Sequence, residues 1–288
     1  MKKISYAIEA FCLYLIFGFL GMLPVTWASG VGGFVGRHVG QRMAVSRKAL
    51  KNIARAFPHD NTSTHQKILM DMWDNLGRTM AEYPHLKTIA AHYVQIENLD
   101  ILDAYPPDQN FVFFSAHLAN WEICAPSIFL ARQIELNLVY RAPNNPWVNR
   151  LLDHYRRAVL NILTIPKSKK GARDIVRVLA DKKHLGILID QKYNEGVAVP
   201  FFGHPAMTSP AFVQLAQKFE APLIPAQVIR ESGCSFRMIF HPPLPTAGRD
   251  VQAVITEAHT LLETWITDHP GQWLWLHRRW DSDALKGL

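Results

Sequence analysis

The chain of 288 residues is long enough to bury one substantial core, and nothing in its composition requires two independent domains. Hydrophobic residues make up 49% and charged residues 19%, a balance that excludes a disordered chain and favours a folded protein with an unusually apolar surface. The net charge of +7 indicates an acidic partner, for which nucleic acid, an anionic membrane face and a phosphorylated lipid all qualify.

The three cysteines, Cys12, Cys124 and Cys234, lie far apart along the chain. Such spacing forms neither a disulfide framework nor the Cys-x-x-Cys pattern of metal and redox sites. The sequence therefore favours a domain that faces a reducing, cytosolic compartment.

The N-terminal segment is strongly apolar. No charged residue occurs from Ala10 through Gly36, a stretch long enough to reach through a bilayer. The helix is expected to break at Pro24 and at the glycines that follow it, Gly30, Gly32, Gly33 and Gly36. This leaves 10–23 as the apolar core, which reaches only about 21 Å at a rise of about 1.5 Å per residue.

An uncleaved anchor accounts for this segment better than a signal peptide, because no clean small-residue cleavage site follows Pro24. We therefore expect a membrane-anchor or interfacial segment over residues 1–40 and a catalytic domain over residues 41–288. The apolar helix is short and both of its flanks are basic, so the sequence leaves open whether it spans the bilayer or lies in its interface.

A basic segment follows the anchor. Apolar residues alternate at helical spacing with the cations Arg42, Arg47, Lys48, Lys51 and Arg55. Two structures fit this pattern: an amphipathic helix that lies on anionic lipid, and a surface helix that packs its apolar stripe on the domain. The sequence does not choose between them.

Helical spacing returns over 61–92, and beyond it short apolar runs alternate with helical segments. Buried strands are expected at 111–116, 136–140, 163–165, 185–189, 223–228 and 236–240. Helices are expected between them at 121–132, 147–160, 171–181 and 210–219, followed by a last helix at 251–268 and a final strand at 273–276. This alternation is typical of βαβ units, so the sequence predicts an α/β fold with a mainly parallel central sheet flanked by helices.

His117 follows the expected strand 111–116, and Glu122 lies five residues later at an expected helix start. Ligands of open α/β sheets gather at the carboxyl ends of strands, where His117 would lie. A carboxylate near a helix N-terminus stays ionised and can accept the Nδ1–H of the imidazole, which leaves Nε2 free to take a proton from a hydroxyl. The pattern predicts His117 as a general base and Glu122 as its partner, while a structural, hydrogen-bonding histidine fits the same spacing.

Three further polar residues follow expected strands. Arg141 comes after 136–140 and could hold a phosphate or carboxylate with both guanidinium nitrogens, as a phosphorylated lipid requires, or form a surface ion pair. Asp190 and Gln191 come after 185–189 and are expected to line the same cleft. There Asp190 could position the acceptor, pair with an arginine, or be a buried structural carboxylate.

Apolar and basic residues near this cleft allow two explanations each. Phe201 and Phe202 with Gly203 could form a wall for an acyl chain, or the phenylalanines could be ordinary core. Positive potential towards an anionic lipid or an acidic carrier protein could come from three arginines on the next helix, Arg150, Arg156 and Arg157. Such charges are also commonly only solvated.

The segment 273–280 mixes tryptophans with His277, Arg278 and Arg279, a composition that also suits stacking and phosphate contact on nucleic acid. No recognised nucleic-acid motif accompanies it, so a basic and aromatic edge at a membrane interface is favoured and no nucleic-acid partner is expected. His277, like His154, stays a candidate for a helping role in catalysis.

The residues around His117 resemble a known family. The run Ser-Ala-His117-Leu-Ala-Asn120-Trp121-Glu122 is similar to the His-x-x-Asn-Trp-Glu block of the bacterial lipid A biosynthesis acyltransferases, the lauroyl and myristoyl transferases of the late acylation steps. Further segments resemble that family in the same order, at 140–146, 189–191, 199–203, Thr208 and 274–280. Together they span most of residues 50–280. The family is in turn similar to the glycerophospholipid acyltransferases, which use His with Asp where this chain has Glu122.

The resemblance implies an inner-membrane enzyme with its active site on the cytosolic side, which moves an acyl chain directly from acyl carrier protein to a hydroxyl of an anionic lipid A precursor. It implies substrate contacts by Asn120, Arg141, Asp190, Gln191, Phe201, Gly203 and Thr208. No metal or organic cofactor is implied, and the sequence agrees, since it lacks the His-Glu-x-x-His, Gly-x-Ser-x-Gly and glycine-rich dinucleotide motifs.

Other functions stay open. Acyl-coenzyme A could replace the carrier protein as donor, and another glycolipid, such as a phosphatidylinositol mannoside, or a lysophospholipid could be the acceptor. A thioesterase would use the same histidine to activate water. A non-catalytic membrane-binding protein would keep every activity and phenotype after His117→Ala, whereas a transferase would lose turnover and keep its membrane binding.

Overall fold

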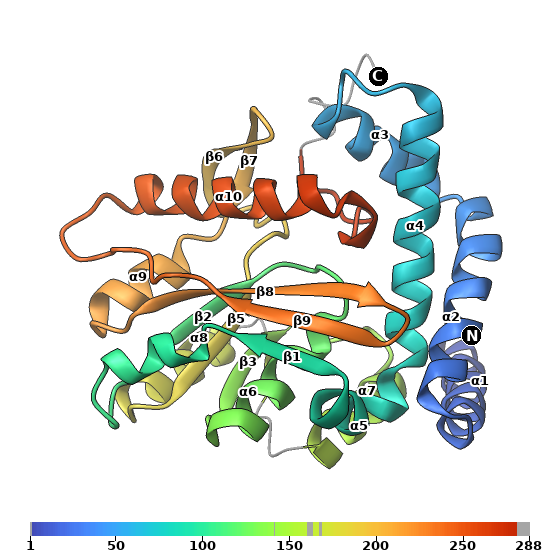
Figure 1. Cartoon of the computed structure of the whole chain (residues 1–288), viewed down its shortest axis with the longest axis horizontal. Coiled ribbons are helices and arrows are strands. Elements are labelled where there is room, and N and C mark those ends of the chain that lie inside the picture. Colours follow the sequence, from blue (N-terminus) through green and yellow to red (C-terminus); the bar gives the residue numbers. More distant parts are fainter. Residues whose placement is uncertain (1, 141, 160–163, 167–168, 281–288) are drawn as a thin grey trace.

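The computed structural model in Figure 1 describes residues 2–140, 142–159, 164–166 and 169–280. It confirms the predicted α/β fold, because a seven-stranded, mostly parallel sheet lies between layers of helices. The strands of this sheet are β1 (Val94–Glu97), β2 (Val112–Ser115), β3 (Leu136–Tyr140), β4 (Thr164–Pro166), β5 (His184–Leu188), β8 (Leu223–Ser232) and β9 (Ser235–Phe240).

The order of strands in the sheet is β1-β9-β8-β2-β5-β3-β4. The five strands from β8 to β4 run parallel, whereas β9 is antiparallel to β8 and β1 is parallel to β9. Val112 of β2 pairs with Leu185 of β5 on one side and with Leu223 of β8 on the other. The carboxyl ends of β2 and β5 therefore meet at one edge of the sheet.

Helices cover both faces of the sheet and enclose two cores. Val112 and Phe114 of β2 belong to one core, together with residues of α8 (Lys169–Ala180), α9 (Ala211–Lys218) and α10 (Val251–Asp268). Phe113 points to the other core, formed with α5 (Leu86–His92), α6 (Cys124–Arg132) and α7 (Pro146–Val159). The alternation follows from the two-residue period of a strand, and it explains why β2 reads as a continuous apolar run.

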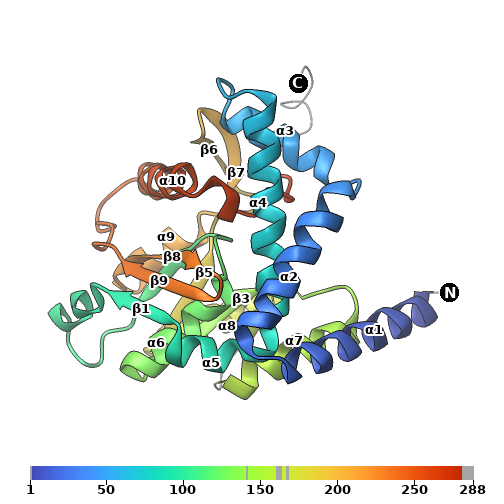
Figure 2. The ribbon, with the colours of Figure 1, turned by 45° about the vertical axis from the view of Figure 1, so that its right-hand side comes forward.

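Four helices begin the chain: α1 (Lys2–Met22), α2 (Val25–Val39), α3 (Ser46–Ala56) and α4 (Thr62–Ala81). Pro24 separates α1 from α2 as predicted, but the prediction that the following glycines break the helix is wrong. All four lie within α2, and three of them, Gly32, Gly33 and Gly36, face α4. A Cβ on Gly32 would clash with the carbonyl oxygen of Gly77, and one on Gly36 with that of Trp73. The two helices pack backbone against backbone (Figure 2), and this contact offsets the low helix propensity of glycine.

Most of the apolar side chains of α1 are exposed, including those of Ile8, Phe11 and Phe19. By length and composition, Lys3–Met22 could cross a membrane. Signal sequences near an N-terminus have the same properties, so this helix by itself is only a weak indication of membrane anchoring.

The apolar stripe of α3 packs on the domain. Ala49 and Ile53 are completely buried in the core shared with α10, and the side-chain amide of Asn52 donates to the carbonyl oxygens of Trp275 and His277, at 2.8 and 2.7 Å. The basic segment was compatible with a helix on anionic lipid or a surface helix packed on the domain. The apolar face of α3 is used for packing on the domain, as in the second alternative.

The prediction of a final strand at 273–276 is wrong. Trp273 forms a single isolated bridge with Leu118, and the N–H of Leu274 donates to the carbonyl oxygen of His117 at 3.1 Å. The segment bonds to the loop after β2 and not to a sheet edge, and the buried indoles of Trp273 and Trp275 anchor it there. The sequence also gave no sign of β1 or of the separate antiparallel hairpin of β6 (Val197–Phe201) and β7 (His204–Thr208).

Candidate active site

His117 and Asp190 meet at the carboxyl edge of the sheet. His117 follows β2 and Asp190 follows β5, and these neighbouring strands bring the two residues together. Nδ1 of His117 lies 2.8 Å from Oδ1 of Asp190, and the backbone N–H of His117 donates to Oδ2 at 2.9 Å. The carboxylate thus fixes both the ring and the main chain of the histidine.

Asp190 is held in its ionised form. Burial, with only 2% of the residue exposed, would by itself raise the pKa of its carboxyl group. The His117 imidazole, the His117 backbone N–H and the indole N–H of Trp273, which donates to Oδ2 at 2.7 Å, outweigh burial and hold that pKa well below its usual range. An ionised acceptor on Nδ1 favours the tautomer with the hydrogen on Nδ1, so Nε2 of His117 is the unprotonated nitrogen and can accept a hydrogen bond.

Nε2 faces a cavity of about 340 Å³. The cavity is lined by Tyr83, His117, Trp121, Glu122, Val139, Tyr140, Arg156, Leu188, Gln191, Leu274 and His277. Of the predicted site residues, the structure therefore brings His117, Glu122 and Gln191 to one cavity, with Asp190 directly behind His117. His277, a candidate helper, also lines the cavity, whereas His154 is exposed on α7.

Gln191 connects two imidazoles. Its amide nitrogen lies 3.1 Å from Nε2 of His117 and 2.9 Å from Nε2 of His277, and the centres of the two rings are 5.4 Å apart. One amide nitrogen carries two hydrogens, so it can donate to both rings when both Nε2 atoms are unprotonated. This contact marks the place where another hydrogen-bond donor can approach His117.

The predicted hydrogen bond from His117 to Glu122 is wrong, because Asp190 occupies Nδ1. Glu122 instead accepts two hydrogen bonds from Arg156 of α7, at 2.7 and 2.9 Å, and one from the Tyr83 hydroxyl at 2.6 Å. Burial would raise the pKa of Glu122, but the Arg156 guanidinium and these hydrogen bonds lower it below its ordinary value. A five-residue spacing could not show that the Glu122 side chain turns towards α7.

Arg156 contributes a mostly buried cation to the cavity, with 11% of its side chain exposed. Its guanidinium lies over the rings of Tyr83 and Tyr140, with centroid distances of 5.9 and 5.5 Å. Burial would lower the pKa of Arg156, but the negative charge of Glu122 raises it, so the cation persists at any physiological pH. One of its terminal nitrogens, Nη1, is buried without a hydrogen-bond partner among the residues that the structure describes.

Asn120 builds the loop that carries His117 and does not line this cavity, so its contact with substrate stays a prediction. Its side-chain oxygen accepts from the backbone N–H of Glu122 at 3.2 Å, and its side-chain nitrogen donates to Glu82, the residue that follows α4, at 2.8 Å. Both Asn75 and Thr79 of α4 donate to the carbonyl oxygen of Ala119 at 3.0 Å. These contacts hold Ala119 in a left-handed conformation, with φ of 47°.

Phe201, Gly203 and Thr208 are not among the residues that line this cavity, and their contacts with substrate stay predictions. Phe201 and Thr208 are completely buried, and the Thr208 hydroxyl accepts a hydrogen bond from Arg279 at 2.7 Å. Gly203 forms the tip of the β6–β7 hairpin with φ of 70°, and a side chain there would meet open space. These residues build the hairpin and its packing. The remaining predicted contact, Arg141, lies outside the described residues.

Sequence reasoning missed Tyr83 and Trp273. Tyr83 comes from the short helical turn after α4, and Trp273 from the segment that was expected to be a strand. No spacing relates either residue to His117, so only a prediction of tertiary contacts could have found them. Within the described ranges, no cluster of three or more His, Cys, Asp and Glu side chains could hold a metal ion.

The geometry defines an α/β protein in which a buried carboxylate orients a histidine at the carboxyl edge of a parallel sheet, with that histidine in the wall of a cavity. Such an arrangement suits acid and base chemistry on a hydroxyl group or water. The family model for bacterial lipid A biosynthesis acyltransferases matches residues 1–282, so the chain belongs to this family and is an acyltransferase. The family indicated by the sequence motifs is confirmed.

One solved structure with a similar chain is the 1-acyl-sn-glycerophosphate (LPA) acyltransferase PlsC from Thermotoga maritima. It is 14% identical, the alignment covers 93% of this chain and 99% of that chain, and the TM-score is 0.42. None of the curated proteins matches the chain.

Proposed function

We propose that this acyltransferase moves a fatty acyl group from the thioester of acyl carrier protein to a hydroxyl of a lipid A precursor, with His117 as the general base. The observation that carries the proposal is the Asp190–His117 pair, which leaves Nε2 as the unprotonated nitrogen of a histidine that lines the cavity. Membership of the lipid A acyltransferase family supports the substrate class. Acyl-coenzyme A is the alternative donor, and another glycolipid or a lysophospholipid the alternative acceptor.

In the proposed first step, Nε2 of His117 takes the proton of the acceptor hydroxyl while the hydroxyl oxygen attacks the thioester carbonyl carbon. Ionised Asp190 stabilises the imidazolium through its 2.8 Å contact with Nδ1. The tetrahedral intermediate then breaks its carbon–sulfur bond, and the departing sulfur takes the proton from Nε2. An ester and a free thiol result, His117 returns to its neutral form, and no metal or organic cofactor enters the steps.

Gln191 positions the acceptor in this proposal. Its amide nitrogen lies 3.1 Å from Nε2 of His117. An acceptor hydroxyl that donates to Nε2 would have to occupy the same position. We expect the acceptor hydroxyl to replace this contact. The amide, still hydrogen-bonded to His277, would then be next to the reacting oxygen.

Glu122 acts through Arg156 and Tyr83 in this proposal and not through His117. Its two carboxylate oxygens fix the guanidinium of Arg156 at the cavity wall, and one of them also fixes the Tyr83 hydroxyl. A cation held in this position favours an anionic substrate group nearby.

The proposed location is the bacterial inner membrane, with the catalytic cavity on the cytoplasmic side. The exposed apolar helix α1 supports contact with a membrane, and the free thiols suit a reducing compartment. In this arrangement a soluble carrier protein and a membrane lipid can both reach His117.

The test is an acyl-transfer assay on purified membranes with carrier-protein and coenzyme A thioesters and a lipid A precursor. We expect His117→Ala to reduce transfer by about 10³-fold or more while membrane recovery is unchanged. The control is His92→Ala, which removes an exposed histidine of α5 and should keep full activity. Release of free fatty acid without transfer would indicate a thioesterase, and inactivity of the wild type with every thioester would contradict an enzymatic role for this site.

A further inference from the structure

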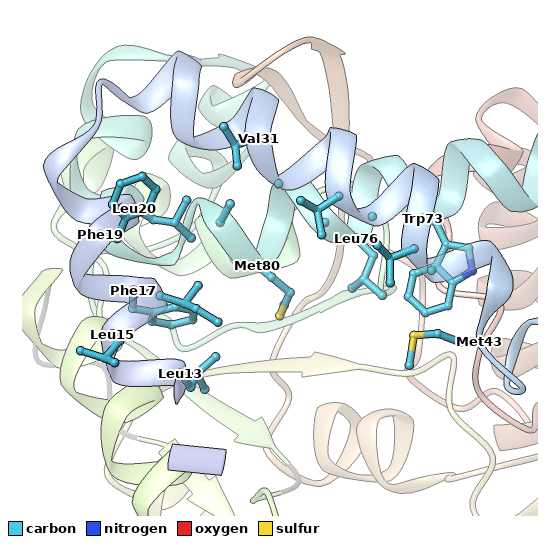
Figure 3. Close-up of a pocket in the computed structure, with 18 residues that line it drawn as sticks. Leu13, Leu15, Phe17, Phe19, Leu20, Val31, Met43, Trp73, Leu76 and Met80 are labelled. Carbon is cyan, nitrogen blue, oxygen red and sulfur yellow. The ribbon is translucent and has the colours of Figure 1, made fainter. Parts of the chain in front are cut away.

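A large apolar groove lies between the N-terminal helices, apart from the catalytic cavity. It encloses about 580 Å³, and its walls come from α1, from α2 with the turn that follows it, and from α4. Figure 3 shows Leu76 and Met80 of α4 between α1, which carries Phe17 and Leu20, and α2, which carries Val31. Its eighteen lining residues are all apolar side chains or glycine, and none is charged.

The groove is open to the surface, and its side chains are unusually exposed for their type. Leu15 is 59% exposed, Val35 50% and Met80 37%. Contiguous apolar surface of this kind marks a binding site in a folded protein, because leaving it in water costs free energy in proportion to its area. The glycines of α2 keep this helix close to α4, so the two helices form one continuous wall.

The groove leads to the catalytic cavity along α4. Leu76, Met80 and Tyr83 follow one another at spacings of four and three residues, which places them on one face of the helix and of the turn that continues it. Leu76 and Met80 line the groove, whereas Tyr83 lines the catalytic cavity. Phe17 of α1 lines the groove and stacks on Tyr83, with ring centroids 5.8 Å apart. One pair of aromatic rings therefore separates the two spaces.

We propose that this groove binds fatty acyl chains of the acceptor lipid while its polar headgroup presents a hydroxyl to His117, an inference that rests on the proposed function. The two spaces match the two halves of such a lipid. The groove is wholly apolar, whereas the neighbouring cavity carries His117, Gln191 and the cation of Arg156.

The acceptor fits the groove better than the donor does. Phe11, Trp27 and Phe34 extend the apolar surface along the same two helices beyond the groove. A lipid that already lies in a bilayer can pass from this surface into the groove without exposing its chains to water. A donor chain delivered by a soluble carrier has no such path, and it would need a closed pocket that removes the whole chain from water.

The experiment fills the groove and measures the Michaelis constants of the two substrates separately. Val35→Trp on α2 and Met80→Trp on α4 each place an indole in the groove from a different wall. Assayed in mixed micelles, each should raise the acceptor KM about tenfold, the factor expected when about two methylene groups lose their burial. The donor KM and the preferred donor chain length should not change.

The matched control is Ile8→Trp, because Ile8 is 59% exposed on α1 and lies outside the groove. It should leave the acceptor KM unchanged, which separates groove filling from a general effect on membrane contact. If one groove variant fails to fold, the other can still be assayed for its acceptor KM, because the two substituted side chains come from different helices.

Each outcome has one meaning. Transfer by the wild type with an unchanged acceptor KM in the groove variants would overturn the groove assignment alone. A changed donor KM or donor chain length would assign the groove to the donor and overturn the proposal. If Ile8→Trp raises the acceptor KM as much as the groove variants do, the effect comes from unspecific membrane contact, and the groove assignment is contradicted. A wild type that transfers nothing to any lipid would contradict the proposed function itself.

Discussion

Two buried carboxylates, Glu122 in the cavity wall and Asp190 directly behind His117, have opposite surroundings. Asp190 faces the imidazole of His117, a group that can carry a proton in acid and base chemistry, and that imidazole also lines the cavity. Glu122 faces a guanidinium, which stays charged, and its oxygens are occupied by Arg156 and Tyr83. The partner therefore decides what each carboxylate does. Proton transfer needs a titrating partner, whereas a permanent cation makes the carboxylate a structural support.

The largest effect is expected from Asp190→Asn. The variant keeps the size of the side chain but removes the charge that stabilises the His117 imidazolium, so kcat should fall by about 10³- to 10⁴-fold. Transfer kinetics on membrane preparations measure this. The melting temperature should fall less than in Glu122→Gln, because Asp190 is paired with an imidazole and Glu122 with a permanently charged guanidinium. A near-normal kcat in Asp190→Asn would contradict this comparison. It would mean that a group other than Asp190 stabilises the His117 imidazolium.

Glu122→Gln should act first on stability. It leaves the Arg156 cation buried without its counter-charge, which typically costs about 3–5 kcal/mol. Thermal unfolding of the detergent-solubilised protein checks this. The double variant Glu122→Gln with Arg156→Met is the matched control, because it removes both charges and should recover most of the lost stability. A Glu122→Gln protein as stable as wild type, with kcat as low as in Asp190→Asn, would show that Glu122 takes part in proton transfer.

The pH dependence gives a second readout of the same pair. The pKa of Glu122 is lowered in the folded protein from its ordinary value of 4.5. Its contribution to stability is therefore complete above pH 4.5 and is lost as the pH falls through the folded-state pKa. Since glutamine does not titrate, the difference in melting temperature between wild type and Glu122→Gln should narrow below pH 4.5.

The smallest effect is expected in the N-terminal helices. Gly36→Ala places a methyl group against the backbone of α4 and should cost about 1–3 kcal/mol of stability, as overpacking does. The control is Gly18→Ala in α1, where a Cβ meets no other atom within 4 Å and alanine should be neutral or stabilising. Equal melting temperatures for the two variants would mean that the close packing of α2 on α4 contributes little.

Several parts of the fold were predictable because they depend on local pattern. The apolar runs predicted the bounds of β2 and β3 closely, because a strand buried on both faces reads as a continuous apolar stretch. The helical spacing predicted the bounds of α10 equally well. The segment 273–276 has a similar composition but bonds to the His117 loop. The glycines of α2 likewise looked like helix breakers, because nothing in the local sequence showed Gly77 on the facing helix.

The sequence predicted where the site lies better than it predicted which side chains contact each other there. His117 after one strand and Asp190 after another placed both at the carboxyl edge, whereas the side chains of Glu122 and Asn120 turned towards α7 and α4. Phe201 and Thr208 belong to segments that resemble the family, and the structure places both in the buried packing of the hairpin, which a motif by itself does not show.

The sequence by itself determined the α/β class, the apolar N-terminus, the family and the histidine at the end of its strand. Each of these depends on residues close together in the chain, or on an ordered set of motifs. Only the tertiary structure decided that Asp190 orients His117, that Glu122 supports Arg156, and that α1, α2 and α4 form an apolar groove beside Tyr83. Those relations join residues from separate elements, and the direction of a side chain across such a distance is set by packing and charge pairing, which local sequence does not contain.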